Sequence, residues 1–451
     1  MKELTIREIA EAVQGTAAFD GVVRDVCIDN RALTPDCLFV CIEGERFDGH
    51  TFAESALQNG AAAVLCARDL GLARQILTDD TRKALLRLAR YYRSLFDIPV
   101  AAVTGSVGKT TVKEMTAAVF ASRYRTVKTE GNLNNEIGLP RTLFRLDADT
   151  EAAVIEMGMN HFGEISRLPR TAMPTMGTIG NIGVSHIENL GSQENILKAK
   201  LEILDGMAEN APLILNGDDR LLYGAKIAGH PVYYYGIDNK YCRFKAYGIE
   251  STPEGAHFTL DFGCGEQRIA LPAIGKHNVY NALAAFAAGF LIGVSPEEAA
   301  EALSRYEPAG MRQRMRSVAG VCFIEDCYNA SPDSVRAAFG TLREIQAKRR
   351  IAVLGDMLEL GSISDEAHRQ SGIRAAEAGT DVLLTYGSQS EKTAAAAREN
   401  GRTQVRSYAD KSALAQDLLG MLHEGDAVLV KGSRGMKLEE ILQKIYEEMG
   451  A

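Results

Sequence analysis

Continuous apolar runs alternate with segments of helical periodicity along most of this chain. An apolar run at 98–103 is followed by helical spacing at 112–120, and further apolar runs stand at 152–157 and 175–182. Runs of this kind predict buried strands, and their alternation with helices is typical of a parallel sheet that helices cover on both faces. We therefore predict an α/β fold with a parallel sheet at its centre.

The two ends of the chain carry the same alternation in separate blocks. Near the N-terminus, apolar runs at 37–42 and 62–66 flank one clear helical segment, 52–60, which ends in a glycine cap. Beyond 307–310, where the helical pattern stops, three apolar runs end at glycine turns, at 351–356, 382–387 and 427–432. These blocks predict a small N-terminal α/β unit and a doubly wound, Rossmann-like unit at the C-terminus.

The length of 451 residues exceeds a single core of roughly 100–200 residues, so several domains are expected. We expect a small domain over 1–80, a central P-loop-type domain over 81–311 and a C-terminal domain over 312–451. A helix predicted at 80–96 stands between the first two, and the boundary is placed just before it. The apolar stretch 281–294 is too short for a membrane span of about 20 residues and predicts a buried helix.

Composition narrows the class of protein. A net charge of −9 argues against a general nucleic-acid-binding protein, which needs a basic face. The eight cysteines include no C-x-x-C pair, so neither a zinc site nor a disulfide framework is expected. The first residues lack the character of a signal peptide. These features favour a cytoplasmic protein with reduced thiols and no membrane span.

The segment 104–111, Thr-Gly-Ser-Val-Gly-Lys-Thr-Thr, lies between a predicted strand and a predicted helix. Backbone N–H groups and the helix dipole attract a phosphate there, and glycines let the backbone approach it. The candidate nucleotide-binding residues are Gly105, Ser106, Val107, Gly108, Lys109, Thr110 and Thr111. In the usual G-x-x-x-x-G-K-[ST] loop the first glycine would fall at Val103, so this spacing selects among nucleotide-binding families.

Two further candidates follow neighbouring predicted strands. Glu156 stands near the end of one strand and His186 follows another. Because the carboxyl ends of parallel strands meet at one edge of a sheet, we expect both beside the glycine loop. A lone glutamate is usually solvated and a lone histidine is usually structural, but Mg²⁺ prefers carboxylates together with phosphate oxygens. Their shared placement favours a metal site.

Polar residues cluster in four other segments. Asn132, Asn134 and Asn135 form either a turn or a contact to a sugar or phosphate. The pair Asn278 and Asn281, on one face of a helix start, either caps the helix or reads a nucleotide. For Lys198 and Lys200, composition alone favours a solvated helix face. A fourth group lies between a predicted strand and a helix that begins near Pro332, which is a common position for a functional site. It consists of Asp326, Tyr328, Asn329 and Asp333.

Taken together, these segments resemble the Mur ligases of bacterial cell-wall synthesis over nearly the whole chain and in the family's order. The family's loop is T-G-[ST]-x-G-K-T-[ST], with the short spacing of 104–111. Further matches stand at 44–50, 131–140, 156–158, 181–186, 275–281, 328–334, 354–361 and 431–434. The Asp-Asn-Pro-Arg box of the members that add diaminopimelate is absent, which favours the branch that adds a dipeptide.

The resemblance implies a UDP-sugar-binding first domain, an ATP-binding second domain and a third domain that closes over both. It implies an ADP-forming amide ligase, in which ATP phosphorylates the terminal carboxylate of UDP-MurNAc-tripeptide and the amine of D-Ala-D-Ala attacks the acyl phosphate. ATP and Mg²⁺ are the implied cofactors, and we expect a monomer with no nucleic-acid partner. Because a carboxylate attacking a γ-phosphate brings two anions together, a lysine and Mg²⁺ must neutralise charge.

The resemblance also implies roles for single residues. Lys109 would contact the β- and γ-phosphates, Thr110 and Glu156 would hold one Mg²⁺, and His186 would hold a second metal ion. It overturns the solvated reading of Lys200, which becomes a carbamate that ligates metal and is catalytic with Lys109 and His186. The implied nucleotide contacts include Asn278, Asn281, Arg312 and Asp326. The implied substrate contacts are Asn30, which replaces the family's usual serine, Arg31, Arg46, Asp48, Gly49, His50, Asn132, Asn134, Asn135 and Asn329.

Two alternatives stay open. A related ligase of the folylpolyglutamate or cyanophycin synthetase type also uses acyl phosphates, but the match of the N-terminal domain speaks against it. A nucleotide-dependent switch of the GTPase type would need an [NT]-K-x-D motif, which the sequence lacks. Nucleotide turnover that requires both ligase substrates would separate these readings.

Overall fold

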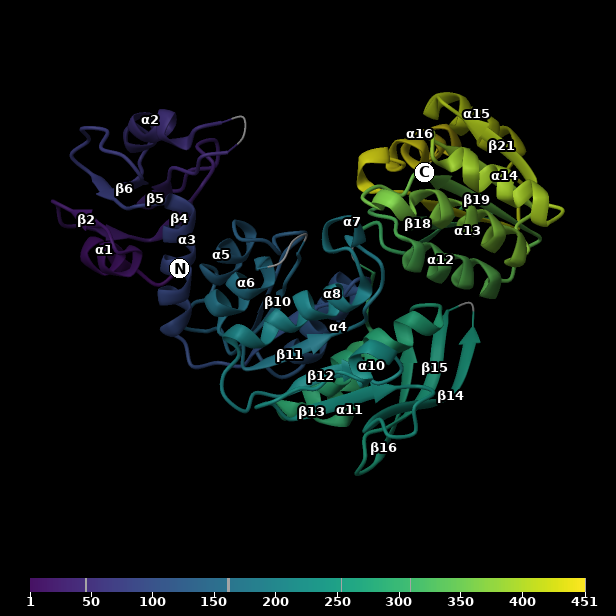
Figure 1. Ribbon diagram of the computed structural model, residues 1–451, viewed down its shortest axis with the longest axis horizontal. Helices are drawn as coiled ribbons and strands as arrows, with labels where there is room; N and C mark the ends of the chain where they lie inside the picture. The colour runs from purple at the N-terminus through teal and green to yellow at the C-terminus, as the bar shows by residue number, and fades with distance from the viewer. Residues whose placement is uncertain (45–46, 160–162, 253, 309, 451) are drawn as a thin grey trace.

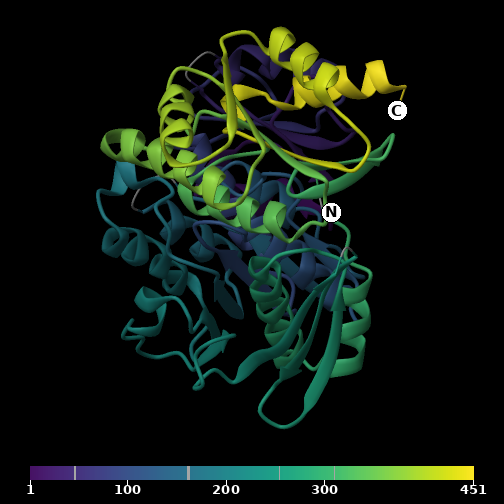
Figure 2. The same ribbon diagram turned by 90° about the vertical axis from the view of Figure 1, so that its right-hand side faces the viewer.

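The computed structural model describes residues 1–44, 47–159, 163–252, 254–308 and 310–450. Three α/β units follow one another in this part of the chain, and the first and the third rise on opposite sides of the central one (Figure 1). In the view turned by 90°, both outer units stand above the central sheet (Figure 2). The predicted α/β class with three units is confirmed.

The first unit is built on a small sheet with the order β2-β7-β6-β5-β4, and β1 pairs separately with β3. The strands are β1 (Leu4–Thr5), β2 (Thr16–Ala17), β3 (Val22–Val23), β4 (Asp25–Cys27), β5 (Cys37–Val40), β6 (Ala63–Cys66) and β7 (Gln75–Leu77). The predicted helix at 52–60 forms as η1 (Gly49–Phe52) and α2 (Ala53–Gln58). The expectation of one clear helix was wrong, because α1 (Ile6–Val13) also forms, with a Thr5–Glu8 capping box at its start.

Helix α3 (Thr81–Ser94) connects the first unit to the central one. It packs against α1 on one side and against α5 (Gly138–Leu143) and α6 (Glu164–Ala172) on the other. Near its C-terminal end the buried Arg93 guanidinium donates to the carbonyl oxygens of Ala172 at 3.1 Å and Phe96 at 2.5 Å. The bond to Ala172 joins α3 to the central unit, and the bond to Phe96 fixes the turn that follows α3. Both acceptors are backbone carbonyls and not carboxylates.

The central sheet has the strand order β16-β15-β14-β13-β12-β11-β8-β10-β9 in the described residues. Its strands are β8 (Val100–Thr104), β9 (Thr126–Lys128), β10 (Ala152–Glu156), β11 (Met176–Ile179), β12 (Leu213–Asn216), β13 (Val232–Gly236), β14 (Phe244–Thr252), β15 (Gly255–Asp261) and β16 (Glu266–Leu271). One face packs against α4 (Lys109–Ala121), α10 (Lys276–Leu291) and α11 (Pro296–Ser304), and the other against α3, α5, α6 and α8 (Gln193–Leu201). The short elements α7 (Ile187–Leu190), η2 (Glu202–Gly206) and α9 (Arg220–Tyr223) complete the unit.

Strand β8 lies between β10 and β11, and all three run parallel. Their carboxyl ends therefore meet at one edge, as the apolar runs predicted. The predicted parallel sheet continues into an antiparallel extension that the sequence analysis did not include, in which β14 pairs with β15 and β15 with β16. Their residues alternate between buried and exposed over short spans, which is the pattern of hairpins with one solvated face.

The third unit contains a sheet with the order β17-β18-β22-β19-β20-β21. The strands are β17 (Arg314–Val318), β18 (Val321–Asp326), β19 (Arg349–Gly355), β20 (Val382–Tyr386), β21 (Gln404–Tyr408) and β22 (Asp426–Lys431). Helices α12 (Pro332–Glu344), α13 (Ser364–Glu377) and α14 (Ser390–Asn400) cover one face, and α15 (Lys411–Met421) and α16 (Glu439–Met449) the other, with η3 (Gly361–Ile363) and η4 (Arg434–Met436) in turns. The three predicted strands and the helix near Pro332 are confirmed.

The predicted buried helix at 281–294 is the second half of α10, whose residues 281–289 are all buried. No helix in the described part of the chain has both the length and the apolar character needed to cross a bilayer.

Candidate active site

The glycine loop connects β8 to α4, which begins at Lys109. Gly108 has φ +84°, and a Cβ there would lie 3.0 Å from the Asn281 amide oxygen. A Cβ on Gly105, at φ +158°, would lie 3.3 Å from the backbone nitrogen of Gly180. The positive φ of Gly108 and the tight contacts at both positions favour glycine, and the loop leads into the start of a helix as the sequence predicted.

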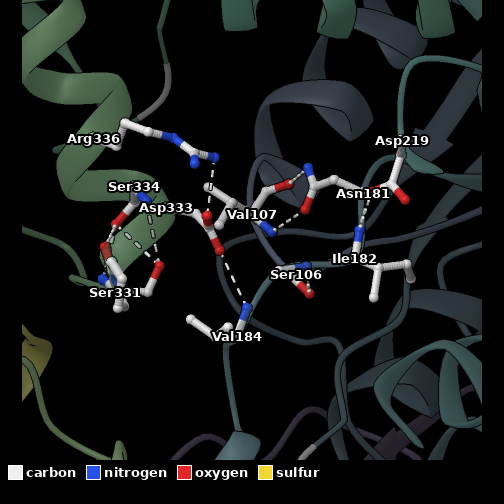
Figure 3. A network of polar contacts seen from close by, with 12 residues as sticks. Ser106, Val107, Asn181, Ile182, Val184, Asp219, Ser331, Asp333, Ser334 and Arg336 are labelled. Atoms are coloured by element: carbon white, nitrogen blue, oxygen red, sulfur yellow. Dashed lines mark hydrogen bonds and ion pairs between the residues drawn. The ribbon is translucent and has the colours of Figure 1, made fainter. Parts of the chain in front are cut away.

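Asn181 holds the loop in shape, a role that sequence reasoning missed (Figure 3). Its side-chain oxygen accepts from the Val107 N–H at 2.9 Å, and its side-chain nitrogen donates to the Val107 carbonyl at 2.8 Å. The Ser106 N–H donates to the Asn181 carbonyl at 3.0 Å. These three bonds fix a loop whose first glycine comes late, and the motif at 181–186 was the signal that marked the partner segment.

Lys109 folds back over the loop, with Nζ donating to the Gly105 carbonyl at 2.9 Å. Desolvation lowers the pKa of Lys109, the negative charge of Glu156 opposes that shift, and the positive charge of Arg312 adds to it. A phosphate oxygen offers this ammonium a stronger, charge-assisted partner than a carbonyl does.

Glu156 ends β10 directly beside the loop, in register with Val103 of β8. Its Oε1 accepts from the Asn134 side chain at 2.7 Å and its N–H donates to the Thr129 hydroxyl at 3.0 Å. Its Oε2 is buried and has no hydrogen-bond partner among the described residues. A buried carboxylate oxygen left without a donor costs free energy, so it points to a cation as partner.

Magnesium fits this donor set. The described residues contain no cluster of three or more His, Cys, Asp or Glu that would make a closed metal cage. Mg²⁺ usually binds one or two carboxylates and takes its other ligands from water and phosphate. Glu156 Oε2 and the buried Thr110, which line the same cleft, offer such a partial set.

Lys200 and His186 flank this edge. Lys200 is 2% exposed, and burial first and Lys109 second depress its pKa far below the ordinary value. The solvated reading from composition is therefore wrong for Lys200, although the neighbouring Lys198 is exposed. His186 has φ +62°, and its Nδ1 lies 3.2 Å from the Glu359 carboxylate of the third unit. The depressed pKa of Lys200 favours its neutral amine, which is the form that reacts with carbon dioxide.

Asn278 and Asn281 are hydrogen-bonded to each other next to the glycine loop. The Asn278 side chain donates to the Ile274 carbonyl at 2.9 Å and accepts from Asn281 at 3.2 Å. Helix α10 starts at Lys276 with Gly275 as its N-cap residue and without a side-chain cap, so the capping alternative for Asn278 is wrong.

The third unit contributes charged and aromatic side chains to the opposite side of the site. Lys431 is 2% exposed and donates to Asp326 at 2.8 Å and to the Asn329 carbonyl at 3.0 Å. The Arg312 guanidinium lies 3.9 Å from the ring centroid of Tyr328. Asp326 is thus held in a buried ion pair, and Arg312 is held flat against an aromatic ring.

A cleft of about 620 Å³ lies between the central and third units and gathers most of the predicted residues. The predicted residues that line it are Ser106, Val107, Gly108, Lys109, Thr110, Thr111, Asn132, Asn134, Asn135, Glu156, His186, Asn278, Asn281, Arg312, Asp326 and Asn329. Gly105 and Lys200 are not among the described residues at its surface.

The candidates of the first unit lie apart from this cleft. Arg31 pairs with Asp29 at 2.7 Å, and Arg141 of the central unit helps to lower the pKa of Asp29. Asp48 accepts from the His50 N–H and ring, and His50 Nε2 accepts from the Ala67 N–H at 3.0 Å. A Cβ on Gly49 would lie 2.7 Å from the backbone nitrogen of Ile42. Asn30 follows Asp29 in the sequence, and Arg46 lies outside the described residues.

The third unit also touches the glycine loop's support, which the sequence did not reveal (Figure 3). Asp333, at the start of α12, accepts from the Val184 N–H at 3.1 Å and from Arg336 at 3.0 Å. A Cβ on Gly183 would lie 2.2 Å from the Asp333 carboxylate, and the Gly183 N–H donates to the Ser106 hydroxyl at 2.9 Å. Both segments carried motifs, but only the fold shows that they meet.

Comparison with known proteins agrees with this geometry. The Mur ligase family catalytic domain matches residues 22–93, the Mur ligase middle domain matches 103–289, and the Mur ligase glutamate ligase domain matches 311–434. A UDP-N-acetylmuramoyl-tripeptide–D-alanyl-D-alanine ligase from Bacillus subtilis is 41% identical, and the alignment covers 99% of each chain. The chain belongs to the Mur ligase family.

Solved structures extend the similarity of this Mur ligase to the whole fold. A structure of MurF from Acinetobacter baumannii superposes with a TM-score of 0.92 at 30% identity and covers 99% of each chain. MurF from Thermotoga maritima in complex with ADP gives a TM-score of 0.86 at 27% identity, over 95% of this chain and 98% of that one. The family membership identifies the chain as a ligase and excludes the nucleotide-dependent switch.

Proposed function

We propose that this Mur ligase uses ATP to join D-alanyl-D-alanine to UDP-MurNAc-tripeptide in peptidoglycan precursor synthesis. The name of the Bacillus subtilis relative supports the substrates, and the ADP complex of the Thermotoga maritima structure supports the nucleotide. The observation that carries the chemistry is Glu156 Oε2, which is buried beside the glycine loop and has no hydrogen-bond partner in the described part of the chain. The 41% identity to the Bacillus subtilis relative over 99% of each chain favours this function over a ligase of the folylpolyglutamate or cyanophycin synthetase type.

The nucleotide would lie along the loop with its phosphates at the start of α4. Lys109 would exchange the Gly105 carbonyl for a β- or γ-phosphate oxygen, because a charge-assisted bond is stronger. Asn278, Asn281, Arg312 and Asp326 would contact the rest of the nucleotide across the cleft. Magnesium, when bound, would supply neutralisation of phosphate charge. Thr110, Glu156, His186 and Lys200 as a carbamate are the residues proposed to hold metal.

In this reaction the protein would position the substrates and exclude water, and it would form no covalent bond to them. A carboxylate oxygen of the tripeptide attacks the γ-phosphorus, and ADP leaves. The dipeptide amine then attacks the carbonyl carbon of the acyl phosphate, the carbon–oxygen bond breaks, and inorganic phosphate departs with that oxygen. The third unit would close over the intermediate, because water would otherwise hydrolyse it.

The remaining assignments belong to the same proposal. The domains 1–80, 81–311 and 312–451 would bind the UDP-sugar, the ATP and the dipeptide, respectively. Asn30, Arg31, Arg46, Asp48, Gly49 and His50 would form the UDP-sugar site, with Asn132, Asn135 and Asn329 near the peptide. We propose that the enzyme acts as a monomer in the cytoplasm.

A phosphate-release assay with purified enzyme tests this function. We expect phosphate release from ATP to require both UDP-MurNAc-tripeptide and D-Ala-D-Ala, and each missing substrate to reduce the rate to background. Running the lysine and diaminopimelate forms of the tripeptide side by side would identify the third stem residue. Equal ATP hydrolysis without either substrate would refute the ligase function.

A further inference from the structure

Asn134 directs its amide at Glu156. Its Nδ2 donates to Glu156 Oε1 at 2.7 Å, and a carboxylate accepts but does not donate, so the amide nitrogen is the end that faces it. Sequence reasoning grouped Asn134 with substrate contacts, but the structure commits one of its donors to the carboxylate.

The bond leaves the two oxygens of Glu156 in different states. Oε1 is occupied by Asn134, while Oε2 is buried without a hydrogen-bond partner among the described residues. The backbone of Glu156 is fixed independently, because its N–H donates to the buried Thr129 hydroxyl at 3.0 Å. With the backbone and one oxygen held, rotation of the carboxyl group would break the Asn134 bond, so Oε2 keeps one direction.

Asn134 is itself held on two sides. The backbone carbonyl of Asn134 accepts a hydrogen bond from the Gly158 N–H at 2.9 Å. A Cβ on Gly158 would lie 3.0 Å from both the amide carbon and the amide oxygen of Asn134. Gly158 is not among the residues with positive φ, so the need for glycine there is space for this amide and not backbone conformation.

The neighbouring asparagine has a different task. The Asn135 side-chain oxygen accepts from the N–H groups of Ile137 at 3.2 Å and Gly138, the first residue of α5, at 2.8 Å. The loop is therefore anchored to α5 by one asparagine and to the strand end by the next.

We propose that Asn134 is a positioning residue that presents Glu156 Oε2 to the magnesium of the bound nucleotide, and that Gly158 is glycine to make room for it. This inference rests on the proposed function, because it concerns the metal that accompanies ATP in that reaction. Partners that orient a metal ligand typically change metal affinity by about 10- to 100-fold when they are removed.

The test measures binding of Mn²⁺, a paramagnetic substitute for Mg²⁺, to the full chain in the presence of ADP by electron paramagnetic resonance. Asn134→Ala is expected to weaken Mn²⁺ binding by about 10- to 100-fold, because Oε2 loses its fixed direction. Gly158→Ala, which keeps Asn134 but crowds its amide, is expected to shift the affinity in the same direction by a smaller factor. Asn189→Ala is the matched control, since it removes an exposed asparagine side chain of the central unit that does not line the cleft, and its Mn²⁺ affinity should stay within about twofold.

A second readout separates positioning from general damage. ADP binding without metal should be retained in Asn134→Ala, and in turnover the apparent KM for Mg²⁺ should rise more than the KM for the tripeptide. Unchanged Mn²⁺ affinity with a raised KM for the tripeptide would overturn the proposal and make Asn134 a substrate ligand. Loss of metal-free ADP binding in both variants would also overturn it, because the contact would then be structural. Failure of the ligase function would show separately, as no substrate-dependent phosphate release by the unaltered chain.

Discussion

Two parallel-sheet edges face each other across the cleft, and they treat their charged groups in opposite ways. At the central edge, Glu156 Oε2 is buried without a partner among the described residues and Lys200 is buried with a strongly depressed pKa. At the edge of the third sheet, Asp326 and Lys431 are buried against each other at 2.8 Å. The two edges therefore differ in whether these central charged groups are paired with each other.

This difference suggests that the two edges have different tasks: the central edge binds the reacting groups, and the third edge supplies a surface against which they lie. An edge with unsatisfied charge gains most from a ligand that brings phosphates and a cation, because the ligand completes its hydrogen bonds and ion pairs. An edge whose charges are already paired is stable by itself and offers a preformed surface. We therefore propose that the nucleotide binds at the central edge, and that the third unit forms the opposite wall of the cleft.

Removal of Lys109 from the central edge should give the largest loss of catalytic activity. Lys109→Ala is expected to lower kcat/KM by about 1,000-fold, because one preorganised charge on the developing transition state contributes on the order of 10²–10³ in rate. Steady-state phosphate release measures it. Lys198→Ala on the exposed face of α8 is the control for loss of a positive charge, and equal activities of the two variants would contradict the role of Lys109.

Breaking the third edge should cost stability instead. Lys431→Met leaves Asp326 buried without its cation, and we expect a loss of about 3 kcal/mol in the free energy of unfolding. Urea unfolding followed by circular dichroism suits this chain, which has no tryptophan. The double variant Asp326→Asn/Lys431→Met should recover part of the loss. A Lys431→Met protein as stable as the parent would show that this pair does not hold the edge.

Lys200 tests whether the buried amine carries a carboxylate. Lys200→Ala should reduce turnover by about 100-fold if a metal ligand is lost, and short carboxylic acids should restore part of it by occupying the space. The matched variant Lys198→Ala, two positions away and exposed, should need no rescue. Full activity of Lys200→Ala, or no response to acetate or formate at any concentration, would argue against the carbamate.

The contact between the units should give the smallest effect. Asp333→Ala removes the acceptor of the Val184 N–H, and the loss of about 1 kcal/mol corresponds to about fivefold faster amide exchange of that segment. Hydrogen-exchange mass spectrometry measures this directly. Asp365→Ala, which removes an exposed carboxylate of the same unit, is the control. Unchanged exchange around Val184 would mean that the carboxylate does not hold the units together.

Much of this arrangement follows from local sequence pattern. The strands that end at Thr104 and Glu156 are continuous apolar runs, and the carboxyl edge they share placed Glu156 beside the loop. The antiparallel extension of the central sheet was missed because short half-buried strands give a weak signal beside the buried ones.

Other features depend on neighbours that are distant in sequence. Lys200 looks like a solvated lysine in its own helix, and only packing against the central sheet buries it. The Asn181 brace and the Asp333 contact each join segments that sequence spacing does not relate. For Asp48 and His50, the structure shows bonds within the first unit, and their contact with the UDP-sugar stays a prediction.

The central claim is that the unsatisfied edge activates a carboxylate as an acyl phosphate. The most direct measurement uses UDP-MurNAc-tripeptide with ¹⁸O in its terminal carboxylate, together with ATP and D-Ala-D-Ala. Mass spectrometry of the released phosphate should find one ¹⁸O per molecule, because the carboxylate oxygen that attacks the γ-phosphorus leaves with it. Phosphate free of ¹⁸O, formed while the amide product accumulates, would contradict the account.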